Sequence, residues 1–230
     1  RLQAENDKLR LSLQNRKNAD ALLKQLKGVL DLAGTAGYKV VGAKVISQGS
    51  TTSFTQSISI DVGSNSGVRS NMTVLSSYGI VGVVKYVYPN SALVQLASDP
   101  AFRIGARIAG SQQIGILSGQ GTRRGVLQLL DNRTQIKKGD VLLARGSQGG
   151  RPFVPGVPIG SVTDVDNSPG AVTQTADVKF YTNFSTLGVV AVVVSGEGTD
   201  PRDALVPPKP IPTPIPTVTV FVTPSPSPTN

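Results

Sequence analysis

The side chains that could do chemistry in this chain are carboxylates, hydroxyls and amines, because its 230 residues include no His and no Cys. This composition excludes Ser-His-Asp and Cys-His nucleophile systems, and it excludes metal sites built on imidazole or thiolate ligands. A hydrolase that pairs Ser with Lys, or a glycosidase with two carboxylates, stays compatible with the sequence. Only 14 Asp and Glu residues are present, however, and none of them lies in a recognisable catalytic motif.

Two short acidic patterns come closest to a reactive site. Asp164 and Asp166 would share one face of a strand, but they precede the turn sequence Asn-Ser-Pro-Gly at residues 167–170, which favours solvated turn positions. The block that begins at Asp61 fails as a calcium loop, because Met72 stands where a bidentate Glu is required. We therefore expect a protein with no catalytic residues, no metal and no cofactor.

Residues 138–162 contain the most strongly shaped loop of the chain. Val141 to Ala144 and the run from Ile159 are apolar and suit strands, whereas the segment between them is rich in Gly and Pro. Gly permits positive φ and Pro fixes φ, so this loop is predicted to be stiff and specifically folded. Pro158 is predicted to be the first residue of the second strand or to lie at an edge. The residues of the loop proposed to contact a partner are Phe153, Val154, Pro155 and Ile159.

The elements that must position these residues are predicted to be β-strands. From Tyr38 onward the apolar period is two, and turn signals recur about every ten residues, which is typical of a sandwich or barrel. Twelve strands are predicted between Val40 and Ser195, with no useful helix between them, so parallel βαβ folds are disfavoured. Twelve strands over this length fit two small antiparallel barrels better than one.

Residues 1–37 are the one helical segment. Four leucines share one heptad position, namely Leu2, Leu9, Leu23 and Leu30, and Leu26 lies at a second position. Glu5 and Arg16 interrupt the stripe, so a short dimerising coiled coil is favoured over a long one. The alternative is an amphipathic helix that packs only on its own domain.

Six short motifs follow one another along the β-rich part of the chain: Asp61-Val62-Gly63 with Gly67-Val68 and Met72-Thr73-Val74, Gly79 to Val84, Ser91 with Val94-Gln95-Leu96 and Asp99, Gly115 to Gly119, Gly139-Asp140-Val141 with Phe153 to Gly160, and Asp177-Val178 with Leu187 to Val192. Taken in this order, they resemble the motifs of the MreC family of rod-shape-determining proteins of bacterial cell-wall elongation. The similarity covers about residues 38–195. Departures at Asn71, at Ala144-Arg145-Gly146 and at Arg151-Pro152 affect loop detail.

The resemblance implies a helix followed by two small β-barrels similar to those of chymotrypsin-like proteases, with no catalytic triad. By analogy the first barrel would be discontinuous, formed by residues 38–97 and 163–195, with the second formed by 98–162. It also implies a single-pass cell-membrane protein with this region on the extracytoplasmic side. Its function would be non-enzymatic: it would scaffold the elongation machinery and maintain cell shape. The implied partners are a second copy of the chain (dimer or higher), MreD and other membrane elongation proteins, the class B penicillin-binding transpeptidase and, indirectly, MreB.

Charge is concentrated in the second predicted barrel. From Arg103 to Arg151 there are nine basic and two acidic residues, a difference of +7 within a chain of net charge +9. The candidate basic patch comprises Arg123, Arg124, Lys137, Lys138, Arg145 and Arg151. Such a patch favours anionic partners such as phospholipid headgroups, wall polymers or an acidic protein face. Charges spread around the barrel for solubility are the alternative. Nucleic acid is disfavoured, because aromatic residues for base stacking are scarce there.

Residues 196–230 are rich in Pro, Thr and Ser and favour polyproline II or disorder. Val218 to Val222 is the exception, since it could add a strand to an exposed sheet edge.

Overall fold

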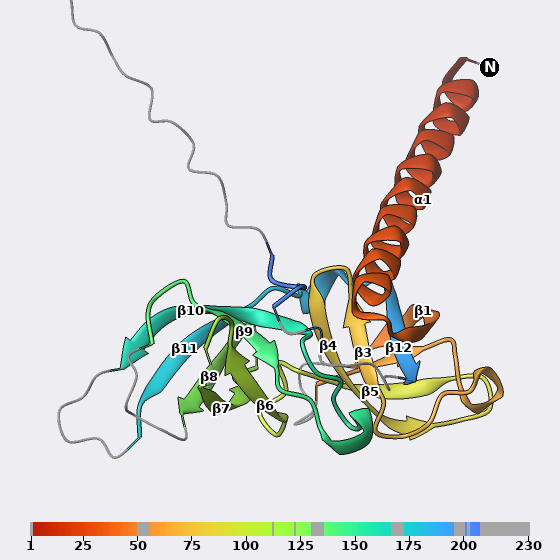
Figure 1. Ribbon diagram of the computed structural model, residues 1–230. Helices are drawn as coiled ribbons and strands as arrows, with labels where there is room; N and C mark the ends of the chain where they lie inside the picture. The colour runs from red at the N-terminus through yellow and green to blue at the C-terminus, as the bar shows by residue number, and fades with distance from the viewer. Residues whose placement is uncertain are drawn as a thin grey trace, which may run out of the picture.

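The computed structural model describes residues 2–49, 56–111, 113–121, 123–129, 136–166, 173–195, 201 and 203–207. A long helix stands out from a body of two adjacent β-barrels (Figure 1). The predicted mainly β architecture, with an N-terminal helix and two antiparallel barrels, is confirmed.

Helix α1 (Leu2–Ala36) ends where a residue with positive φ follows it. Gly37 has φ +71°, and the next backbone amide, of Tyr38, donates to the carbonyl of Ala33 over 2.9 Å. This is the Gly-terminated helix end that glycine makes without steric cost. Gly34 lies inside the last turn. Among the helices that the structure describes, none combines the length and apolar character needed to cross a membrane.

The first barrel closes in the strand order β1-β12-β3-β4-β5-β2. Its strands are β1 (Lys39–Gln48), β2 (Ser57–Ile60), β3 (Thr73–Ser76), β4 (Gly79–Val87), β5 (Ala92–Leu96) and β12 (Val189–Ser195). In β2 the buried Ile58 and Ile60 alternate with half-buried serines, so the predicted two-residue period is confirmed there. The branched residues fill the interior and the polar ones face outward.

The second barrel closes in the order β10-β11-β8-β7-β6-β9. Its strands are β6 (Arg103–Ile108), β7 (Ile114–Gly119), β8 (Arg124–Leu129), β9 (Val141–Ala144), β10 (Pro158–Asp166) and β11 (Thr175–Phe180). β10 begins at Pro158 as predicted, where the missing amide donor costs no ladder bond. The predicted strand, loop and strand of residues 138–162 are thus β9, the connecting loop and β10.

The boundary predicted at residue 163 is wrong. β10 continues to Asp166 between β9 and β11, and β11 pairs with β8, so both strands belong to the second barrel. Only β12 returns to close the first barrel. The physical reason is edge closure. A division at residue 163 would remove β11 from the second barrel. The barrel would then have an open edge, and its interior would lose the inward-facing side chains of Ala176, Val178 and Phe180.

A short stretch after β12 packs back onto this body. The Asp203 carboxylate forms an ion pair with Arg107 at 2.7 Å and accepts from the amide of Gly110 at 2.9 Å. Leu205 is buried. The predictions made for the rest of the tail, including the strand at Val218 to Val222, lie outside the described residues.

Candidate functional site: surfaces for partner binding

The leucines predicted for self-association divide into two groups. Leu9, Leu23 and Leu30 are exposed by 59%, 63% and 50%, so no described residue of the chain covers this heptad position of the projecting helix. Leu26 is half-buried and points to the first barrel, where its Cδ1 atom lies 3.6 Å from the position a Cβ would take at Gly42. The Leu2 side chain is outside the described residues. The structure therefore leaves a stripe of Leu9, Leu23 and Leu30, named here the leucine stripe, for contact with another molecule.

The opposite face of α1 fixes the helix to the barrel. Val29 and Ala33 are buried, and the side-chain Oε1 atom of Gln25 accepts from the backbone amides of Gly188 and Val189 at 3.2 and 3.0 Å. Gly28 lies so close to the β3–β4 turn that an added Cβ would come 2.7 Å from the Cβ of Ser77. Nothing in the sequence predicted this attachment. The available signal was Gly28, a glycine in the interior of a predicted helix.

The loop residues predicted to bind a partner pack inside the protein. Phe153 and Val154 are 8% and 1% exposed, Ile159 is fully buried and Pro155 is half-buried. Phe153 meets Phe102 edge to face at 5.4 Å between ring centroids, and the Tyr38 hydroxyl donates to the carbonyl of Pro155. In this structure their side chains stabilise the joint between the barrels, and they do not present a free apolar face.

Thr73 is central to this joint. Its hydroxyl, in the first barrel, donates to the Pro152 carbonyl at 2.7 Å and accepts from the Val154 amide at 3.1 Å. Gly79 approaches the same loop, because a Cβ there would lie 2.1 Å from the carbonyl oxygen of Pro158. Both residues stand within the motifs that carry the resemblance, but nothing in the sequence indicated that they contact the loop.

A second set of buried hydrogen bonds joins the barrels beside β4. The Thr182 hydroxyl is fully buried, donates to the carbonyl of Ile80 at 2.7 Å and lies 3.1 Å from the hydroxyl of Ser76. Where the chain passes from β5 to β6, the side chain of Gln56 accepts a hydrogen bond from the hydroxyl of Ser98 and donates one to the carbonyl of Gly121. With polar contacts at several separate places, the two barrels form one firmly connected unit.

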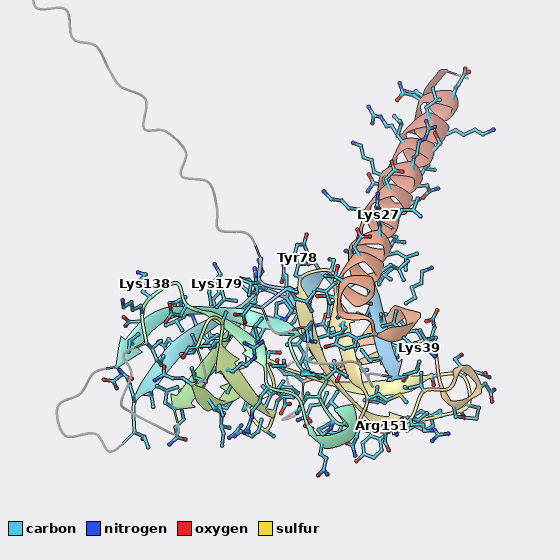
Figure 2. All side chains as sticks on the ribbon, in the orientation of Figure 1. Lys27, Lys39, Tyr78, Lys138, Arg151 and Lys179 are labelled. Atoms are coloured by element: carbon cyan, nitrogen blue, oxygen red, sulfur yellow. The ribbon has the colours of Figure 1, made fainter. Side chains whose placement is uncertain are left out.

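The six residues of the predicted basic patch occupy several places. Lys137 and Lys138 are exposed at the turn before β9, whereas Arg145 and Arg151 are exposed in the loop after it. Figure 2 shows Lys138 and Arg151 far apart on the body. Like charges repel one another, and the sequence around these residues has no pattern that would place them all on one face of the barrel. Both causes account for this spread. Two of the six, Arg123 and Arg124, line a hollow in the protein surface.

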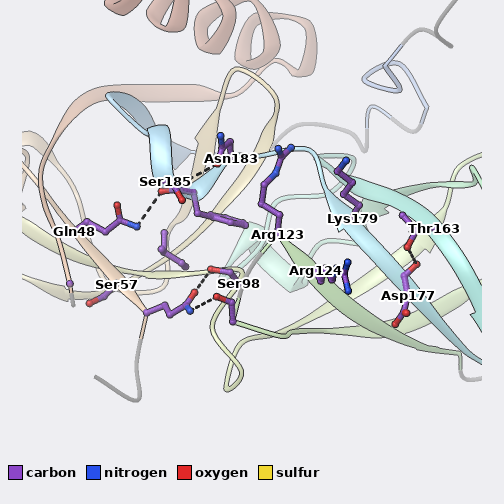
Figure 3. Close-up of a pocket in the computed structure, with 15 residues that line it drawn as sticks. Gln48, Ser57, Ser98, Arg123, Arg124, Thr163, Asp177, Lys179, Asn183 and Ser185 are labelled. Carbon is purple, nitrogen blue, oxygen red and sulfur yellow. Dashed lines mark hydrogen bonds between the residues drawn. The ribbon is translucent and has the colours of Figure 1, made fainter. Parts of the chain in front are cut away.

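That hollow is a cleft of about 720 Å³ between the two barrels, named here the inter-barrel cleft (Figure 3). Arg123, Arg124 and Lys179 line it from the second barrel, and among the described lining residues Asp177 alone is acidic. Lys179 lies directly opposite Arg124 in the β11–β8 pairing. Lys179 was not predicted from the sequence, because it lies outside the 103–151 region in which positive charge is concentrated.

The acidic residues considered for catalysis lie apart from the inter-barrel cleft. Asp164 and Asp166 are exposed on β10, and the Asp61 carboxylate accepts from the Lys44 amide at 2.6 Å. Within the described ranges no three acidic residues gather in a group that could hold a metal ion. Tyr181, beside the buried Leu205, has its phenol pKa raised by burial and partly lowered again by a hydrogen bond with Ser161. The geometry therefore provides contact surfaces formed by apolar and cationic groups.

Comparison with known proteins gives one consistent family. Residues 45–194 match the family described as "Rod shape-determining protein MreC, barrel core". The cell shape-determining protein MreC of Listeria monocytogenes is 31% identical over 176 residues, which are 74% of this chain and 59% of that protein. This chain thus spans about three fifths of the length of that relative.

Solved structures similar to this chain point to the same family. A structure of MreC is 28% identical with a TM-score of 0.67, covering 76% of this chain and 98% of that one. A more distant structure, a complex between penicillin-binding protein PBP2 and MreC from Helicobacter pylori, is 18% identical with a TM-score of 0.53, covers 68% of this chain and 99% of that one, and shows a shared fold. The matched region includes all twelve strands except the beginning of β1 and the end of β12. This chain therefore belongs to the MreC family of rod shape-determining proteins.

Proposed function

We propose that this chain is a non-enzymatic scaffold that organises the bacterial cell-wall elongation machinery and so maintains cell shape. The observation that carries the proposal is the match of residues 45–194 to the MreC barrel core, over a body of two connected barrels. A sequence with no His and no Cys also has few means of catalysis. Function would then depend on which surfaces the folded chain presents to its partners.

Self-association is the first part of this proposal. The three leucines of the leucine stripe lie at one heptad position, with Arg16 at the place between Leu9 and Leu23, and their side chains are exposed by half or more. Two such helices could bury their stripes against each other in a short coiled coil. Burial of apolar area contributes about 25 cal/mol per Å², so three leucines on each helix give a modest, concentration-dependent dimer.

Binding to the elongation transpeptidase is the second part. The MreC of Helicobacter pylori forms a complex with PBP2, and family membership makes a class B penicillin-binding protein the expected partner here. We further propose MreD, other membrane elongation proteins and, indirectly, MreB as members of the same assembly. The cell membrane, with this region on the extracytoplasmic side and a membrane anchor elsewhere in the protein, is the proposed location.

Biolayer interferometry tests the transpeptidase partnership. The soluble part of the class B penicillin-binding protein from the same organism is immobilised and the chain is titrated over it. Saturable binding is expected, with no cleavage of peptide or glycan substrates by the chain. A class A penicillin-binding protein serves as the control for nonspecific adhesion. Equal binding to both proteins would contradict the proposal, and so would turnover that a single Ser substitution abolishes, since the latter would favour a Ser-Lys hydrolase.

A further inference from the structure

The inter-barrel cleft combines positive charge with hydrogen-bonding groups in a way that the scaffold function does not explain. One wall holds Arg123, Arg124 and Lys179. No carboxylate of the described residues forms an ion pair with any of the three. Asp177 lies toward one end, where Thr163 donates to its backbone carbonyl at 3.1 Å. Three cations against one carboxylate leave this wall positive.

Arg123 is held in place. One terminal nitrogen of its guanidinium donates to the carbonyls of Phe180 and Tyr181 at 3.2 and 3.1 Å. Its Nε atom is buried and has no hydrogen-bond partner among the described residues. Figure 3 shows the side chain between Asn183 and Lys179, in the middle of the lining residues. Because the buried Nε is closed to a ligand, Arg123 contributes to the cleft through the positive charge of a guanidinium fixed by its two carbonyl contacts, and little side-chain entropy is lost when an anion binds beside it.

The facing wall carries uncharged polar groups. Gln48, from the end of β1, donates to the carbonyl of Phe184 at 3.3 Å, and the Asn183 side chain accepts from the Ser185 amide at 3.3 Å. The same lining includes Ser57 and the apolar Leu96. Amides and hydroxyls next to apolar carbon suit a polypeptide, whose backbone needs hydrogen bonds and whose side chains bring apolar area.

We propose that the inter-barrel cleft binds an extended acidic peptide segment of a protein partner. Its Asp or Glu carboxylates would bind to Arg123, Arg124 and Lys179, and its backbone would bond to the polar wall. A phosphate-rich wall polymer would satisfy the cations but would leave the side-chain amides of Gln48 and Asn183 and the apolar Leu96 without matching groups. The peptide therefore fits the cleft better. This proposal goes beyond the scaffold function, because it concerns one cleft and can be tested without any elongation protein.

Fluorescence polarisation with synthetic probes tests the proposal on the full chain. The probes are fluorescein-labelled peptides of alternating Glu and Ala, the same peptide with Gln in place of Glu, and a labelled polyphosphate of equal charge. We expect the Glu peptide to bind, the Gln peptide to bind at least about tenfold more weakly, and salt to weaken the Glu peptide.

Charge reversal locates the site. The variant R124E/K179E changes two exposed residues that line the cleft, and it is expected to weaken Glu-peptide binding about tenfold or more. The control K138E/R151E makes the same change in net charge at exposed residues outside the cleft, and it is expected to keep most of the affinity. Circular dichroism melting of both variants verifies that they fold, and R124Q/K179Q replaces the reversal variant if it does not.

Three results would overturn the proposal. These are equal binding of the Glu and Gln peptides, equal loss of affinity in the cleft variant and its control, and binding of polyphosphate without binding of the Glu peptide. The last result would indicate an anionic polymer as the ligand. Failure in any of these ways leaves the transpeptidase interaction unaffected, because that interaction is measured with a different partner.

Discussion

At the scale of single residues, the joint between the barrels depends on polar groups whose partners lie far away in the chain. Thr73 and Val154 are separated by 81 positions, yet one hydroxyl bonds to two backbone groups of the loop. The sequence indicated a shaped loop between two strands here, and the structure places this segment between β9 and β10. It could not indicate what the loop packs against, because Phe153, Val154 and Ile159 look the same whether they face a partner or the other barrel.

Replacing Thr73 by Val tests the joint at this scale. Val keeps the shape but removes the hydroxyl, so the buried Val154 amide loses its acceptor. Leaving a buried donor unsatisfied costs about 1–3 kcal/mol, and we expect T73V to lower the free energy of unfolding by that amount. Urea denaturation followed by circular dichroism gives the value.

Thr163 provides the matched control. Its hydroxyl also donates to a carbonyl, that of Asp177 at 3.1 Å, but this bond is exposed to water. T163V should therefore change stability by less than about 0.5 kcal/mol. If T73V and T163V cost the same, the hydrogen bonds of Thr73 do not stabilise the joint.

At the scale of elements, the number and order of strands were predictable but their allocation to barrels was not. Turn residues and the two-residue period are local signals, and they located all twelve strands. Pairing is not local. The boundary predicted at residue 163 assigned the end of β10 and all of β11 to the first barrel, although closure of the second barrel requires both strands. The predicted basic patch had the same difficulty, since only Arg123 and Arg124 of its six residues line the inter-barrel cleft.

The attachment of α1 gives the prediction at this scale. Gln25 is the polar contact that fixes the helix to the start of β12, through the amides of Gly188 and Val189. We expect Q25A to lower stability by about 1–3 kcal/mol and to speed amide hydrogen exchange at residues 186–189. Hydrogen exchange followed by mass spectrometry measures this, together with thermal unfolding.

Gln14 is the control for this helix, because it is fully outside the contact with the barrel. Ala has the higher helix propensity, so Q14A should leave stability unchanged or raise it by a few tenths of a kcal/mol. Unchanged exchange at residues 186–189 in Q25A would show that apolar packing of Val29 and Ala33 alone fixes the helix.

At the scale of the whole molecule, closed barrels direct association to the helix. Each six-strand barrel pairs all of its edges, so strand addition has no free edge among the described strands. The projecting helix is different: its leucine stripe is exposed along a rod that the barrel holds in a fixed direction. We therefore expect two copies to meet through their helices, with the inter-barrel clefts left open for other partners.

Light scattering coupled to size-exclusion chromatography, over a range of concentrations, tests this central claim most directly. The chain of 23.9 kDa should approach twice that mass as concentration rises. The variant L9E/L23E/L30E should stay at the mass of one chain, while Q14E/N18E/A21E, which adds the same charge to other exposed helix positions, should still dimerise. A chain that stays at 23.9 kDa throughout, or a stripe variant that dimerises like the control, would contradict the account.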